Sequence, residues 1–255
     1  IDDATDQLIF EVSDGTDEYS LTSVATFTTA GWNHFVVVWD QDSASGSELY
    51  INGVANTATD AGTIGNIDDL SNALAFRTGA ESDDGNPFDG KLDEIREYNR
   101  TLAVGEIQSL YDQGGGTKVN SAVSNSQGTG RLDSGLAGYW ALDNGSGTSA
   151  TDSSTNGNTG TLTNGPTWGT GQIVGAVTFD GINDEITTTT DQGTGAQIKV
   201  FTLSSWFKTS TASGAKIIGL EDSQTGTGTT TWDRQIWMGT DGKIRFGVYN
   251  GYIEA

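Results

Sequence analysis

The chain has 255 residues, with 34 acidic and 12 basic side chains and a net charge of -22 at pH 7. A surface this negative repels nucleic acid and anionic membranes, so neither is expected as a partner. The chain has no cysteine, which rules out disulfides and thiolate metal sites. No apolar run approaches the ~18 residues of a membrane span, and no segment of these residues has the pattern of a signal peptide, so any targeting segment is expected to lie outside them. The chain's single methionine is Met238, and because a natural chain would start with Met, we expect this one to have been cut from a longer protein or processed.

The first part of the chain is predicted to be strands joined by turns. Residues 32–40, WNHFVVVWD, are apolar at odd and even positions, which is typical of a strand covered on both faces. Asn52-Gly53 after residues 48–51 is the strongest short-range signal for a hairpin. Further strands are expected over residues 7–15, 19–28 and 73–77.

Residues 88–111 are predicted to form a strand, a turn and one short helix. In the strand, Asp93, Ile95 and Glu97 alternate with Leu92, Glu94, Arg96 and Tyr98, which indicates two different faces. After Leu102 the spacing becomes helical, with Ile107, Leu110 and Tyr111 in one apolar stripe. Glycines 114–116 end the helix, and no other helix longer than about three turns is expected.

The remainder begins with a region of different composition. Residues 114–135 hold no aromatic side chain and are rich in Gly, Ser, Asn and Thr, which predicts a flexible linker. Short strands separated by turns are then expected over residues 136–142, 176–179, 185–190, 201–209, 216–220, 235–239 and 243–249. The whole pattern predicts an all-β protein.

One segment near each end of the chain is similar to the other. Residues 8–15, LIFEVSDG, match residues 244–251, IRFGVYNG, at Phe, Val and Gly, with an acid or Asn before the Gly. A repeat at this distance has the period of a whole domain rather than that of a solenoid unit.

Several motifs together resemble the laminin-G-like, concanavalin A-like family. They are GYWALDNGSGT at 138–148, DSSTNGNTG at 152–160, FDGIND at 179–184, FTLSSW at 201–206, WNHFVVVWD with LYING at 32–53, and FDGKLDEIREYNRTL at 88–102. The resemblance implies an all-β fold, a concanavalin A-like jelly-roll β-sandwich. The family often has Ser three residues before the helix Glu, whereas this chain has Ala103 before Glu106, so the capping box is expected to be lost.

The motifs occur in an order that differs from the family's. Residues 1–113 resemble the C-terminal half of one domain, residues 114–135 form the linker, and residues 136–255 resemble the N-terminal half of a following domain. The favoured interpretation is a window of a tandem repeat, in which each half is completed by sequence outside the window or by another copy. In the alternative the chain closes on itself, and residues 1–15 and 239–255 would then compete for one strand position.

The resemblance implies a structural calcium held by Asp152, Asn156, Asn158 and Asp93. The loop around Gly157 carries side-chain oxygens of the kind that calcium binds, although an Asx-rich turn with solvated side chains explains the same residues. A second metal candidate is Asp180, Asn183 and Asp184, where a turn between two strands is favoured. The acidic residues Glu81, Asp83 and Asp84 are interpreted as a solvated loop.

Enzyme activity is not expected. His34 is the single histidine and lies within a strongly apolar strand, so a packing role is favoured over a catalytic one. Paired carboxylates can hydrolyse glycosides without histidine, but the E-x-D-x-x-E strand of jelly-roll glycosidases is absent.

Tryptophan is the residue type that points to a ligand, because aromatic rings stack on the apolar faces of sugars. Trp39, Trp140 and Trp206 lie in strand patterns and are expected in the core. Trp168 and Trp232 lie in polar, Gly- and Thr-rich surroundings and are the candidates for ligand binding.

Three functions remain open at the level of sequence. The first is a non-catalytic extracellular or cell-surface binding and adhesion module, with a glycan or a neighbouring protein as partner. The second is a structural repeat that builds a stalk or filament by complementation between neighbouring repeats or copies of itself. The third is an accessory module of a polysaccharide-degrading enzyme. Membrane insertion is not expected in any of them.

Overall fold

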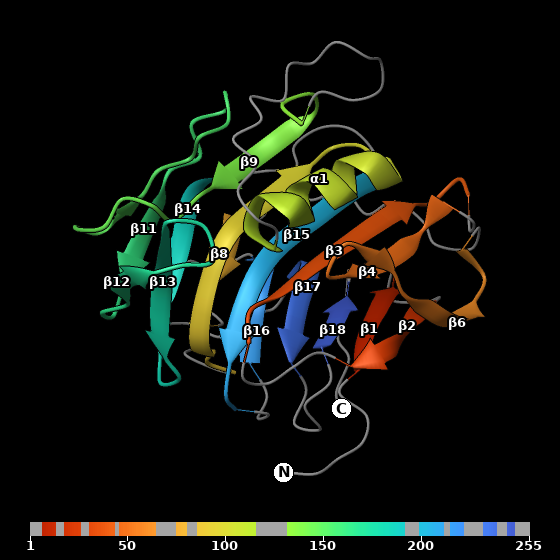
Figure 1. Ribbon diagram of the computed structural model, residues 1–255, viewed down its shortest axis with the longest axis horizontal. Helices are drawn as coiled ribbons and strands as arrows, with labels where there is room; N and C mark the ends of the chain where they lie inside the picture. The colour runs from red at the N-terminus through yellow and green to blue at the C-terminus, as the bar shows by residue number, and fades with distance from the viewer. Residues whose placement is uncertain are drawn as a thin grey trace.

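The described part of the protein consists of two β-sheets packed against each other, with one helix on the outer face of the smaller sheet (Figure 1). The computed structural model describes residues 7–13, 18–26, 31–43, 46–64, 75–80, 86–115, 132–191, 199–211, 215–221, 232–238 and 244–247. The sheets are almost wholly antiparallel, and the main core contains side chains from both. The predicted all-β jelly-roll β-sandwich is thereby confirmed.

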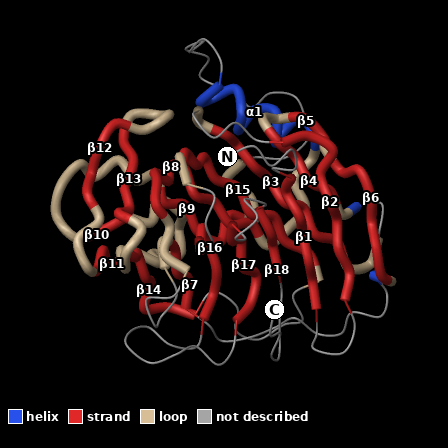
Figure 2. The backbone as a smooth tube through the Cα atoms, turned by 90° about the horizontal axis from the view of Figure 1, so that it is seen from below, coloured by secondary structure: helices blue, strands red, loops and turns tan. Residues whose placement is uncertain are grey.

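The larger sheet has ten strands in the order β10-β11-β14-β7-β16-β17-β18-β1-β2-β6 (Figure 2). In that order they are Ser149–Ala150, Gly160–Thr163, Glu185–Asp191, Ala75–Thr78, Ala215–Glu221, Trp232–Met238, Ile244–Gly247, Gln7–Ser13, Glu18–Thr26 and Thr57–Gly62. The smaller sheet has the order β12-β13-β8-β15-β3-β4-β5, and β9 pairs with β8. Its strands are Thr167–Thr170, Gly175–Asp180, Asp89–Tyr98, Val200–Thr209, Asn33–Asp40, Glu48–Ile51, Val54–Ala55 and, for β9, Leu136–Trp140.

Strand β3 is buried on both faces, as its sequence predicts. Phe35, Val37 and Trp39 point into the main core between the sheets, whereas Val36 and Val38 belong to a second apolar cluster. Helix α1, Val104–Gly115, covers this second cluster from outside (Figure 1). The other buried members of the second cluster are Tyr50, Tyr98, Leu102, Ile107 and Leu110.

The end of helix α1 packs against a stack of aromatic rings on the sheet. Tyr111 of the helix stacks on Trp206 of β15 with ring centroids 5.6 Å apart, and His34 of β3 lies 5.0 Å from Trp206. Gly114 allows this close approach, since a Cβ there would lie 2.8 Å from carbon atoms of the Trp206 ring. The helix runs to Gly115, slightly beyond residue 114, where the linker was predicted to begin.

Strand β8 contains a β-bulge that the alternating pattern does not predict. Its pairing with β15 shifts register between the partners of Ser204 and Trp206. Glu94 has a φ of 54°, a left-handed conformation that is uncommon for a residue with a Cβ. Because the bulge absorbs one residue, Leu92 and Ile95 both reach the main core. The simple alternation, which put these two residues on opposite faces, is wrong at this point.

Two local predictions concern a turn and a helix cap. The Asn52-Gly53 hairpin is confirmed, with φ values of 52° and 77° that suit a type I′ turn. The capping box of α1 is only half lost: Ala103 has no side-chain acceptor, but its backbone N–H still donates to the Glu106 carboxylate at 2.9 Å. Arg100 donates to both oxygens of the same carboxylate, at 2.8 and 2.6 Å.

Strands from the two parts of the chain interleave in both sheets. β15 lies between β8 and β3, and β7 lies between β14 and β16. Residues 1–113 and 136–255 thus complete each other within one chain, which is the less favoured of the two arrangements considered from the sequence. The division at 113 and 136 into halves of two different domains stays a prediction.

The expected competition between the two ends of the chain does not occur. β1 and β18 do not exclude each other but lie side by side in the ten-stranded sheet (Figure 1). They pair in parallel, with Leu8 opposite Ile244, Ile9 opposite Arg245 and Phe10 opposite Phe246. Every other strand pair among the described residues is antiparallel.

Candidate functional site

The Asp152 carboxylate organises the turn that the sequence proposed as a calcium loop. Its Oδ1 accepts hydrogen bonds from the backbone N–H groups of Tyr139 (3.0 Å) and Ser154 (2.8 Å). Its Oδ2 accepts from the Ser154 hydroxyl (2.8 Å) and the Asn158 N–H (2.7 Å). The Asn156 amide donates to the carbonyls of residues 136 and 137, so the turn is tied to the start of β9.

These bonds decide how well the turn fits calcium. A carboxylate has about four lone-pair sites, and Asp152 uses four of them to accept hydrogen bonds within the turn. The side-chain amides of Asn156 and Asn158 donate to the carbonyl of Ala137. In this conformation the Asp152 turn therefore fits the Asx-turn interpretation and does not fit a calcium site. Calcium binding at these positions stays a prediction from the family resemblance.

Asp93, the remaining member of that proposed set, contacts a different segment. It lies where the edge of β8 passes from β13 to β9, and its Oδ2 accepts from the backbone N–H of Ile173 at 2.8 Å. The residue is fully buried. Burial raises the pKa of Asp93 to about 7, partly offset by the Ile173 hydrogen bond and reinforced by the negative charges of Glu94 and Asp143. Asp93 is therefore half protonated near neutral pH.

The second metal candidate forms the turn between β13 and β14. Asp184 accepts from the backbone N–H of Asp180 at 3.0 Å, and Asp180 accepts from that of Ile182 at 2.9 Å. The backbone carbonyl of Asn183 accepts from the Asn164 amide at 2.8 Å. Burial raises the pKa of Asp184. Within the described ranges, no group of three or more His, Cys, Asp or Glu side chains could hold a metal ion. Glu81, Asp83 and Asp84 lie outside those ranges.

A buried polar cluster beside the bulge was not singled out from the sequence. Glu94 forms an ion pair with Arg96 and accepts hydrogen bonds from the Tyr139 hydroxyl at 3.2 and 3.0 Å. The Arg96 guanidinium lies over the Tyr139 ring, 4.2 Å from its centroid, and also donates to Gln113 at 3.4 Å. The alternation of opposite charges along β8 was the available signal. The cluster links β8, β9 and α1, and this is a structural role.

The single histidine is a core residue, as predicted. His34 is 1% exposed, and its Nε2 lies 2.9 Å from the Ser204 hydroxyl. Burial, helped by the positive charge of Arg96, lowers the pKa of His34 to about 3. The imidazole is neutral at physiological pH and sealed between β3, β15 and α1, so it cannot act as a general base on a solvent-borne substrate.

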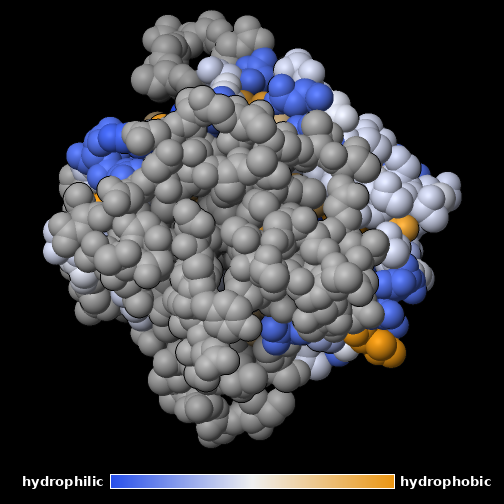
Figure 3. All heavy atoms as spheres, turned by 180° about the vertical axis from the view of Figure 1, so that it is seen from behind, coloured by the Kyte–Doolittle hydropathy of each residue, from blue (hydrophilic) through white to orange (hydrophobic). Residues whose placement is uncertain are grey.

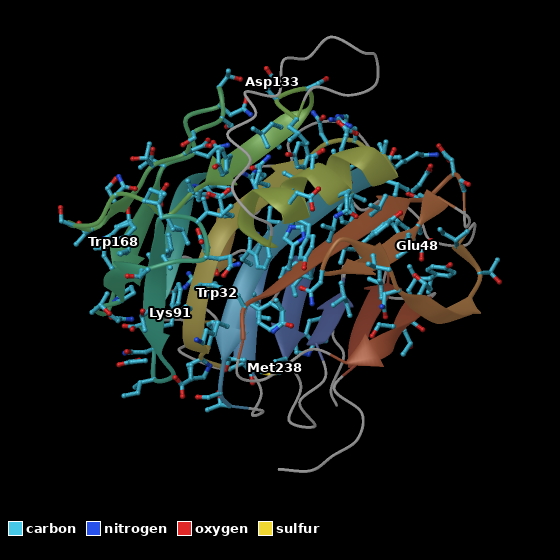
Figure 4. All side chains as sticks on the ribbon, viewed as in Figure 1. Trp32, Glu48, Lys91, Asp133, Trp168 and Met238 are labelled. Carbon is cyan, nitrogen blue, oxygen red and sulfur yellow. The ribbon has the colours of Figure 1, made fainter. Side chains whose placement is uncertain are left out.

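The tryptophans divide largely as the sequence indicated. Trp39, Trp140 and Trp206 are buried, which confirms their core assignment. Trp168 lies on β12, the edge strand of the smaller sheet, where it is partly exposed (Figure 4). Trp232 begins β17, and its side chain lies outside the described residues.

Trp168 is held rigidly beside an exposed polar loop. Its indole N–H donates to the carbonyl of Gly147 at 2.7 Å, and the ring packs in part against the main core. The loop of residues 143–149 is exposed throughout. On the neighbouring side, the Lys91 ammonium donates to the carbonyl of Thr170 at 3.3 Å (Figure 4). A fixed, partly exposed ring flanked by hydroxyl, amide and ammonium groups has the composition of a sugar-binding surface.

On the face seen in Figure 3, the described residues offer little apolar area. The described residues seen from behind are mostly hydrophilic or intermediate, with only small hydrophobic spots near the margin (Figure 3). Within the part of the chain that is described, no helix has the length and apolarity needed to cross a membrane.

Comparison with known proteins agrees with this architecture. Residues 1–108 match the family model described as the concanavalin A-like lectin/glucanases superfamily, a laminin-G domain type. This part of the chain is thus similar to laminin-G-like domains. No curated protein and no solved structure matches the chain.

Proposed function

We propose that this protein is a non-catalytic extracellular binding module that recognises a glycan through the edge formed by β12 and residues 143–149. The observation that carries the proposal is the partly exposed ring of Trp168, fixed by its hydrogen bond to Gly147. A ring already immobilised loses little side-chain entropy on binding, so its stacking energy contributes almost fully to affinity. Laminin-G-like domains typically occur in extracellular proteins, which supports the proposed location.

The absence of catalysis is part of the same proposal. The single histidine is buried with a pKa of about 3, and the described residues include no group of three or more His, Cys, Asp or Glu side chains that could hold a catalytic metal ion. If the chain belongs to a polysaccharide-degrading enzyme, it would serve as an accessory module that holds the polymer near a catalytic domain.

The test compares tryptophan variants on a printed glycan array. We expect the unaltered chain to bind a subset of glycans, and Trp168→Ala to weaken that binding about tenfold or more, the equivalent of ~1.4 kcal/mol. Trp168→Phe keeps an aromatic face and should retain much of the affinity. Trp32, another partly exposed tryptophan that lies just before β3, gives the matched control Trp32→Ala (Figure 4).

Three outcomes have distinct meanings. Selective loss in Trp168→Ala, with folding confirmed by circular dichroism, supports the proposed edge. Equal loss in both alanine variants, or none in either, places the glycan elsewhere. If the unaltered chain binds no glycan on the array, the glycan is removed from the proposal and the neighbouring-protein partner takes its place.

A further inference from the structure

The only parallel strand pair of the described sheets joins the two segments that are similar in sequence. β18 and β1 lie together in the ten-stranded sheet, between β17 on one side and β2 on the other (Figures 1 and 2). Leu8 and Phe10 face Ile244 and Phe246. In each pair the two residues are 236 positions apart along the chain, which is the offset of the sequence repeat. The two copies of the repeat therefore pair with each other in register, as identical strands do when they stack in parallel.

The topology shows that one strand position is filled twice. β17 runs antiparallel to β18, and β2 runs antiparallel to β1. Since β1 and β18 point the same way, either copy alone would be antiparallel to both β17 and β2. Removing one copy would leave a sheet that is antiparallel throughout. The described contact between the copies extends over three facing pairs, fewer than the six between β1 and β2, and parallel pairing is slightly less stable per residue than antiparallel pairing.

We propose that the seam between β18 and β1 is a self-association site, at which β18 of one copy of this chain pairs with β1 of a second copy. The partner is a second copy because the two edges that meet at the seam are already complementary within one chain, in sequence, direction and register. When the seam opens, each molecule presents both edges. Exchange therefore replaces one β18–β1 pairing by an equivalent pairing, and no pairing of the sheet is lost.

This contact can close or propagate. Two molecules that exchange reciprocally form a closed dimer, whereas exchange in one direction leaves a free β1 edge at one end and a free β18 edge at the other. The second arrangement extends into a chain of molecules, because each end repeats the edge that has just been paired. The proposal does not depend on the glycan site, since β12 lies at one end of the smaller sheet and the seam lies within the larger one.

The natural absence of cysteine makes a direct test possible. Adjacent strands are ~4.8 Å apart, which is within the ~4.4–6.8 Å between Cα atoms that a disulfide spans. One preparation carries Leu8→Cys, and a second, with a different affinity tag, carries Ile244→Cys. The two are mixed over a range of concentrations under mild oxidation, and covalent heterodimers are measured on non-reducing gels.

The matched control replaces the Ile244→Cys preparation by Met238→Cys. Met238 faces Ile244 from β17, so it lies one strand farther from β1. We expect the facing combination to form heterodimer at least about tenfold faster than the control, and faster at higher protein concentration. A double variant, Leu8→Cys with Ile244→Cys in one chain, shows whether the seam also closes within a molecule.

Two results would overturn the proposal. In the first, the double variant forms its link within one chain, while the mixed single variants give no more heterodimer than the control; the seam would then be closed and not exchangeable. In the second, no combination forms a link, and the seam itself would be refuted. Glycan binding by the monomeric double variant keeps this result separate from the fate of the proposed function.

Discussion

The buried imidazole of His34 makes the stability of this protein depend on pH in a predictable way. The unfolded chain takes up a proton at the ordinary histidine pKa of 6.5, whereas the folded chain does so only near pH 3. Between these values the unfolded state binds one more proton than the folded state, so the free energy of unfolding falls as the pH falls. The loss is about 2 kcal/mol at pH 5 and approaches ~5 kcal/mol near pH 3, at ~1.36 kcal/mol for each pKa unit.

The perturbation that isolates this effect is His34→Gln. Glutamine can still hydrogen-bond to the Ser204 hydroxyl, which lies 2.9 Å from the imidazole Nε2, but it cannot take up a proton. The variant is expected to be less stable at pH 7.5, because glutamine does not reproduce the ring contacts with Trp206 and Tyr111. The difference between the two proteins should shrink by about 2 kcal/mol on going from pH 7.5 to pH 5.

Two measurements check the reasoning. Urea unfolding of both proteins, followed by tryptophan fluorescence at several pH values, gives the difference in free energy. Because the chain has one histidine, NMR gives its pKa directly from a single set of ring resonances. A difference that stays constant with pH, or an imidazole that titrates near pH 6.5 in the folded protein, would refute the account of His34 as a buried neutral group.

Three further predictions follow from close contacts and buried charges. Gly114→Ala should destabilise by about 1–3 kcal/mol, because the new Cβ would lie 2.8 Å from the Trp206 ring. Gly105→Ala lies in the same helix, but no atom is within 4 Å of its new Cβ, so it should instead stabilise the protein by about 0.5–1 kcal/mol. Thermal melts that rank the two variants in the opposite order would contradict the packing of α1. Asp93→Asn should be more stable than the unaltered chain by a few kcal/mol at pH 8 but not at pH 4. The reason is that burial raises the pKa of Asp93 to about 7 in the folded protein, so the free energy of unfolding of the unaltered chain falls as the pH rises from ~4 to 7. Unfolding curves measured in chelator at both pH values test this. Asp152→Asn should lower the free energy of unfolding by about 2–4 kcal/mol, because it breaks hydrogen bonds to the carboxylate. The loss should be the same with calcium and with chelator. If calcium raises the melting temperature of the unaltered chain but not that of the variant, Asp152 binds calcium after all.

Local pattern was enough to predict the elements whose neighbours are nearby in sequence. Residues 32–40 carry apolar side chains on both faces of the strand because one face meets the core and the other meets α1. The Asn52-Gly53 turn follows from the positive φ that both of its residues must adopt. The three tryptophans predicted to lie in the core are buried because alternate residues of a β-strand point to the same face.

Of the features that escaped prediction, two depend on partners far along the chain and one depends on hydrogen bonds within a local turn. The bulge at Glu94 arises from pairing with β15, more than a hundred positions later. The Asp152 carboxylate could be interpreted as a ligand until its four hydrogen-bond donors were seen. The pairing of β1 with β18 was missed because a strand position that is filled twice contradicts the usual assumption of one strand for each place.

The position of β15 also determines when this protein can fold. β15 hydrogen-bonds to β3 on one side and β8 on the other, and its Ser204 contacts a histidine 170 residues earlier. During synthesis at ~5–20 residues per second, roughly 5–20 seconds pass between the emergence of β8 and that of β15. Throughout that interval the two flanking strands have open edges of the kind that aggregate.

The charge of the chain acts on the same interval. The acidic excess is concentrated in residues 1–113, which are the residues that must wait. Like-charged nascent chains repel one another, so we expect this part of the sequence to keep unfinished molecules apart until β15 arrives. Because salt screens such repulsion, aggregation during refolding from urea should increase with ionic strength, while the folded protein stays dispersed. The net charge would then be a property selected for assembly of the sandwich rather than for its ligand.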